Sequence, residues 1–72
     1  MNHTVQLFDV VALAVDRPAD GLVRGQVGTV VETHADDCFE VEFSDDAGKT
    51  YAMLALPGEQ LMTLHHAPVR AS

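Results

Sequence analysis

The stretch "GLVRGQVGTVVETH" (residues 21–34) decides the fold of this chain. It carries three glycines within eight residues and continues into valines and threonines. A phosphate-binding loop needs its glycines to open a helix and a Lys-Ser/Thr pair to follow, and this stretch has neither. Glycine at the start of a strand instead marks a bulge or a sharp bend. We therefore predict a curved strand with Gly28 at a bulge or close backbone approach, and Gly21 in a turn of positive φ.

The sequence on either side of this stretch consists of short β-type runs separated by turn signals. The runs that we expect to form strands are residues 5–15, 26–34, 38–44, 49–56 and 61–64. Between the first two, "DRPADGLVRG" (residues 16–25) combines proline, glycine and charge, which predicts a long loop. No helical period runs long enough to compete. Five short strands with one long early loop predict an all-β fold in the form of a small barrel, which hides strand edges.

The alternation of apolar and polar residues shows which face of one predicted strand is buried. In "CFEVEF" (residues 38–43) one face carries Phe39, Val41 and Phe43, and the other carries Glu40 and Glu42. We expect the first face to be buried, together with Val10 and Leu13, and the two glutamates to be exposed.

"YAMLAL" (residues 51–56) is apolar on both faces. Tyr51, Met53 and Ala55 share one face, and Ala52, Leu54 and Leu56 share the other. A chain this small cannot easily bury both. Either Leu22 and Val23 of the long loop cover this strand, or a second subunit does, and the sequence leaves both open.

Composition limits the chain to one domain over residues 1–72, with an ordered core at about 5–65 and a flexible tail at 66–72. Eleven acids against four bases give a formal net charge of −7, and the bases form no block. Phosphate backbones attract clustered Lys and Arg, so nucleic-acid binding is disfavoured. A basic protein partner suits this charge, although acidity also serves solubility alone.

The single cysteine excludes an internal disulfide and suits a reducing cytosol. The first ten residues lack the basic start and apolar run of a signal peptide, and no apolar stretch is long enough for a membrane span. We therefore expect a cytoplasmic protein with no membrane partner.

The segment "RGQVGTVVE", followed one turn later by "FEVEF", resembles the KOW-type, SH3-like barrel segment of ribosomal and transcription proteins. Over residues 7–64 the chain more closely resembles a bacterial family of small proteins that is known only as a domain of unknown function. The matching stretches are "LFDVVAL", "GLVRGQVGTVVE", "FEVEFSDDAGKTYAMLAL" and "EQLMTL". The resemblance implies an SH3-like β-barrel without established catalytic residues. Some relatives are encoded beside predicted toxin genes, which implies an antitoxin or immunity role.

Two groups of residues have the side-chain types that a metal site or a catalytic site needs. His34, Asp36, Asp37 and Cys38 are all ligand types for a transition metal, but their spacing matches no strong zinc pattern, and a polar hairpin tip, where Asp favours turns, is the simpler interpretation. Whether they bind a metal stays open. A catalytic cysteine needs a neighbouring base, whereas Cys38 is surrounded by acids. We predict no enzyme activity, no cofactor and no metal site.

The remaining hypothesis is a small acidic module that binds a protein partner such as a toxin, or a second copy of itself. The residues predicted to form its surface are Arg17, Leu22, Arg24, Glu40, Glu42, Leu54 and Leu56. The alternative is a nucleic-acid-associated, KOW-like accessory protein, which would need Arg17 and Arg24 to form a local positive patch.

Overall fold

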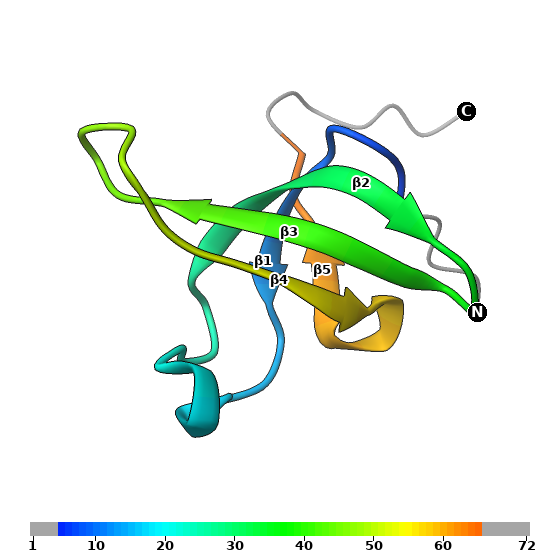
Figure 1. Ribbon diagram of the computed structural model, residues 1–72, viewed down its shortest axis with the longest axis horizontal. Helices are drawn as coiled ribbons and strands as arrows, with labels where there is room; N and C mark the ends of the chain where they lie inside the picture. Colours follow the sequence, from blue (N-terminus) through cyan, green and yellow to red (C-terminus); the bar gives the residue numbers. More distant parts are fainter. Residues whose placement is uncertain (1–4, 66–72) are drawn as a thin grey trace.

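The structure, a computed structural model, describes residues 5–65 and consists of five β-strands and two short 3₁₀ helices (Figure 1). The strands are β1 (Val10–Leu13), β2 (Val27–His34), β3 (Cys38–Ser44), β4 (Thr50–Pro57) and β5 (Leu61–Thr63). The 3₁₀ helices are η1 (Pro18–Asp20) and η2 (Gly58–Gln60). The all-β prediction with five strands is therefore confirmed. The predicted flexible tail lies outside the described residues.

All five strands belong to one antiparallel sheet in the order β4-β3-β2-β1-β5. The sheet twists strongly, so that β1 and β5 lie behind β3 and β4 in Figure 1. β4 and β5 are its two edges, and the described residues contain no ladder that joins them.

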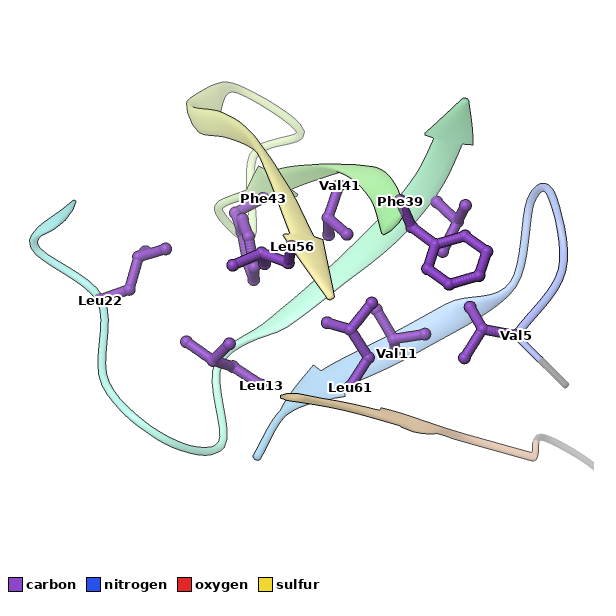
Figure 2. Packing of buried hydrophobic residues seen from close by; sticks show 10 residues of the cluster. Val5, Val11, Leu13, Leu22, Phe39, Val41, Phe43, Leu56 and Leu61 are labelled. Atoms are coloured by element: carbon purple, nitrogen blue, oxygen red, sulfur yellow. The ribbon is translucent and has the colours of Figure 1, made fainter. Parts of the chain in front are cut away.

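The core fills the space between the two halves of this twisted sheet (Figure 2). β3 contributes Phe39, Val41 and Phe43 to it, as the alternation predicts. β1 contributes Val11 and Leu13, and Val10 is only half-buried. The prediction for Val10 was wrong because successive side chains of a strand point to opposite faces, and Leu13 and Val10 differ by an odd number of positions.

β1 is shorter than the apolar run that predicted it, because a tight turn occupies residues 6–9. The amide of Asp9 donates to the carbonyl of Gln6 (3.1 Å), and the amide of Gln6 donates to Oδ2 of Asp9 (2.9 Å). Phe8 lies in this turn with a φ of 72° and 71% of its surface exposed. Left-handed backbone is costly for an aromatic residue, so the turn is strained at Phe8.

Residues 14–26 connect β1 to β2 and hold themselves together by backbone hydrogen bonds. Arg17 and Leu22 form an isolated antiparallel bridge around η1, and Gly21 follows η1 with a φ of 71°, as predicted. The bridge turns Leu22 inward, where it is 1% exposed within the core. This connection thus contributes the buried Leu22 to the core, and its half-buried Val15 packs against the same cluster.

Gly28 lies in β2 opposite Phe43 of the neighbouring strand β3. A Cβ atom at this position would lie 2.7 Å from Cγ1 of Val41 and 2.8 Å from the carbonyl oxygen of Glu42. The predicted close backbone approach is confirmed. The bulge itself lies further along the strand, where the register of β2 against β3 shifts between Val30 and Glu32.

Candidate functional site

The outward face of β3 carries Glu40 and Glu42, opposite the buried Phe39, Val41 and Phe43. Both glutamates are half-buried rather than exposed, which corrects the prediction. β3 has a neighbouring strand on each side, so the side chains of β2 and β4 shelter its outward residues. The hydroxyl of Thr50 also donates a hydrogen bond to Oε2 of Glu42. Nε2 of His34 lies 3.0 Å from Oε1 of Glu40. Both carboxylates are thus held in place on this face.

Glu32 joins these two glutamates because of the bulge in β2. By plain alternation from Gly28 and Val30, which are buried, Glu32 would point inward. The register shift after Val30 instead places Glu32 opposite Glu40. We call Glu32, Glu40 and Glu42 the acidic face. Sequence reasoning missed Glu32, and the one signal that could have found it is that a charged residue at an inward position demands a bulge.

The pairing of Glu32 with Glu40 places two carboxylates directly opposite each other on neighbouring strands. Like charges in this position destabilise a sheet. Within residues 5–65 neither glutamate forms an ion pair with Lys or Arg, and only His34 lies beside Glu40. This arrangement can accept hydrogen bonds from a cationic group, and it gains from one because a cation would relieve the repulsion.

One apolar face of β4 packs against the core and the other is exposed. The face in the core is the one that carries the predicted contact residues Leu54 and Leu56. Ala52, Leu54 and Leu56 pack against the core, with Leu56 fully buried and Leu54 half-buried. Leu56 therefore cannot contact a partner, and its assignment to the partner surface was wrong. The outward residues are Met53 and Ala55, which lie beside Glu42 and Glu40 in the register. The apolar surface next to the acidic face is therefore made by Met53 and Ala55.

Tyr51 does not continue the row of Met53 and Ala55. A second register shift, between Phe43 and Ser44, interrupts the alternation at this point. The ring of Tyr51 lies 6.4 Å from that of the buried Phe43, centroid to centroid, and its hydroxyl oxygen accepts a hydrogen bond from the side-chain amide of Gln26 (3.1 Å). Tyr51 thus links β4 to the connection between β1 and β2.

The connection between β1 and β2 carries the other three predicted surface residues. Leu22 is buried in the core, so its prediction as a contact residue was wrong. It lies in the same core cluster as Leu56 of β4, whereas Val23, which was also expected to cover that strand, is exposed. Arg17 pairs with Asp20 (Nε to Oδ2, 2.8 Å) and donates to Gln60 (2.8 Å). Arg24 is exposed, and its amide donates to Asp16. Asp20 thus pairs with the guanidinium of Arg17, and Asp16 accepts from the backbone of Arg24.

The turn between β2 and β3 holds the residues considered as metal ligands. Asp36 and Asp37 both have a positive φ, of 62° and 57°. The carbonyl of Asp37 accepts from the amide of Gly58 (2.9 Å), and His34 points toward Glu40. Across residues 5–65 no three side chains of His, Cys, Asp or Glu gather closely enough to hold a metal ion. The conformation of this turn is thus explained by its backbone contacts.

The sheet and its acidic face define a small all-β domain. Its sequence matches the family described as domain of unknown function (DUF4926) over residues 7–63, which is more than half of the chain, and the chain belongs to this family. Neither the curated proteins nor the solved structures gave a significant match. Among the described residues there is no helix with the length and apolarity to cross a membrane.

Proposed function

We propose that this chain is a small acidic protein-binding module, and that its acidic face takes a basic segment of a protein partner. One observation carries the proposal: Glu32 and Glu40 lie directly opposite each other, at a cost to the sheet, with no Lys or Arg paired to them in the described structure. A partner that supplies Lys or Arg at this position removes that cost on binding.

The surroundings of the acidic face support a protein partner. Met53 and Ala55 place exposed apolar surface beside Glu42 and Glu40. Protein interfaces combine an apolar centre with a polar, charged rim. The net charge of −7 adds long-range attraction for a basic partner, which increases the rate of encounter.

The family resemblance suggests the form that this binding takes. If relatives are encoded beside toxins, the partner is a toxin and the chain is its antitoxin or immunity protein, acting in the cytoplasm, where its one free cysteine stays reduced. The nucleic-acid alternative needs free bases at Arg17 and Arg24, and Arg17 is engaged with Asp20 and Gln60.

The strand order supports the finer assignment of the fold as an SH3-like barrel. Consecutive strands β1 to β4 are neighbours, and β5 returns to pair with β1. This connectivity curls a strongly twisted sheet into a barrel that stays open between β4 and β5 within the described residues. On this proposal, the acidic face is the outer wall of the barrel.

The test compares two variants that each remove one exposed negative charge. Glu32→Gln neutralises the acidic face, and Asp46→Asn is its control in the turn between β3 and β4. The product of the neighbouring gene is co-expressed with each chain and its affinity is measured at several salt concentrations. We expect Glu32→Gln to weaken binding and lower its salt dependence, and Asp46→Asn to leave both near the wild-type values. Equal effects of the two variants would contradict the proposal, and salt-dependent binding to RNA by the wild-type chain would favour the alternative.

A further inference from the structure

The outer edge of β4 presents backbone groups that have no partner within the described structure. The amide of Leu13 donates to Gln26 and the amide of Val30 donates to Asp9, so β2 bonds to β1 through its inward residues. Bonding directions alternate along antiparallel strands, so β3 bonds to β4 through Phe39, Val41 and Phe43. Their partners on β4 are Leu56, Leu54 and Ala52. The amides and carbonyls of Met53 and Ala55 therefore point away from the sheet.

This edge lacks the features by which proteins usually protect an edge strand. Natural edges carry charged side chains, prolines or bulges that turn them away, or they are very short. β5, the other edge, has three residues. β4 has eight residues, and none of them is charged. Its one proline is Pro57, at the end of the strand, and its bulge lies at Tyr51, so the segment from Ala52 to Leu56 is unprotected.

We propose that β4 pairs antiparallel with β4 of a second copy of this chain, about a two-fold axis at Leu54. In this register Met53 lies opposite Ala55 of the second copy, and Ala55 lies opposite Met53. Each pair exchanges two backbone hydrogen bonds, so all four of the groups that point outward on each copy are satisfied. The inference concerns the chain alone and does not depend on the proposed function.

The backbone selects this register over its neighbours. Shifting the axis to Met53 places Ala55 opposite Tyr51, which lies at the bulge. Shifting it to Ala55 places Met53 opposite Pro57, which has no amide hydrogen to donate. Only the axis at Leu54 places both Met53 and Ala55 opposite residues that can donate and accept a backbone hydrogen bond.

The side chains are complementary in the same register. The half-buried Leu54 meets Leu54 of the second copy, and the exposed Met53 meets Ala55 on the outward face. The apolar side chains of the two edges thus face each other in matching pairs, as a two-fold axis requires.

The first experiment uses two methionines that are exposed almost equally, Met53 at 52% and Met62 at 53%. Sedimentation of the full chain over micromolar to millimolar concentrations should show a monomer–dimer equilibrium. Met53→Lys should weaken the dimer at least tenfold, because it places a charge at the paired edge. Met62→Lys, on β5, should leave the dissociation constant within about twofold of the wild type. A wild-type chain that is monomeric throughout, or equal effects of the two variants, would overturn the proposal.

The second experiment tests the backbone pairing itself. Ala55→Pro removes an amide that points away from β3, so the fold, measured by circular dichroism, should survive while the dimer is lost. A folded Ala55→Pro chain that still dimerises excludes edge pairing.

The third experiment measures the register. In a Cys38→Ser background, Leu54→Cys places a thiol on the axis, in a non-hydrogen-bonded pair, where facing Cβ atoms approach most closely. This variant should form a disulfide-linked dimer under mild oxidation, whereas Met62→Cys in the same background should not. Faster cross-linking through Met62→Cys would overturn the assignment of the interface to β4.

Discussion

Gly28 is the residue at which the packing of β2 against β3 depends on the absence of a side chain. We predict that Gly28→Val destabilises the fold by about 1–3 kcal/mol or more, because the new Cβ overlaps the backbone of Glu42 and the side chain of Val41. Thr29→Val, one position along and facing outward, should change the free energy of unfolding by less than about 1 kcal/mol. Urea unfolding measures both. Equal losses would show that the close approach relaxes without cost.

Phe8 is a second residue whose backbone conformation conflicts with its side chain. At a φ of 72° an aromatic residue is strained, and the exposed ring gives little burial in return. We predict that Phe8→Asn stabilises the chain by about 1 kcal/mol, since asparagine adopts the left-handed region more readily. Leu7→Asn, also exposed but without a positive φ, serves as the control and should bring no gain. A loss of stability in Phe8→Asn would indicate that the ring packs against something in solution.

At the scale of single elements, β3 shows what alternation predicts well and β2 shows what it does not. The pattern of Phe39, Val41 and Phe43 on one face is regular, and the structure buries all three. β2 contains a bulge, and a bulge adds one residue without any change in the composition of the strand. Glu32 therefore reached the acidic face unpredicted. β4 shows the same limit, since its bulge separates Tyr51 from Met53.

The opposed carboxylates of Glu32 and Glu40 should be measurable as a cost. We predict that Glu32→Gln raises the free energy of unfolding by about 0.2–1 kcal/mol, because it removes the repulsion between facing like charges. Asp46→Asn, in the exposed turn between β3 and β4, should raise it by less. Thermal or urea unfolding at low salt measures the difference. If Glu32→Gln instead lowers stability, Glu32 contributes to the fold and the support for a binding role is removed.

At the scale of the whole molecule, the connection between β1 and β2 packs against the core through the buried side chain of Leu22. We predict that Leu22→Ala costs about 2–5 kcal/mol, since the side chain is fully buried among residues from several strands. For so small a domain that is a large part of the total stability. Val23→Ala removes a neighbouring, exposed side chain and should cost less than about 0.5 kcal/mol. Equal effects would mean that Leu22 is not packed in solution as it is in the structure.

The net charge also acts on the molecule as a whole. Eleven acids against four bases leave an excess of negative charge, and the mutual repulsion of the acids weakens the compact state. We predict that the melting temperature rises when NaCl is increased from about 0.01 M to about 0.15 M, over which the screening length falls from about 30 Å to about 8 Å. A melting temperature that falls over this range would show that the few ion pairs, such as Arg17 with Asp20, outweigh the repulsion.

The sequence was sufficient for the all-β class and for the five strands, because turn residues and alternation are local signals. It was not sufficient to show that Leu22 lies in the core while its neighbour Val23 is exposed. That difference depends on the bridge between Arg17 and Leu22, which turns Leu22 inward. The residues of the predicted partner surface were accordingly divided by the fold, with Leu22 and Leu56 in the core and Glu40 and Glu42 on the outer face.

The pairing of β5 with β1 has a consequence for biosynthesis. As the chain leaves the ribosome, β2, β3 and β4 can each dock on the strand that was made just before it. The edge of β1 that pairs with β5 stays unpaired until residues 61–63 have emerged, because β5 is the last strand to be synthesised. Translation of nearly the whole domain therefore precedes the completion of its core. A nascent chain that stalls before Leu61 has emerged would leave this edge of β1 accessible to chaperones and proteases. Emergence of β5 from the ribosome would cover it.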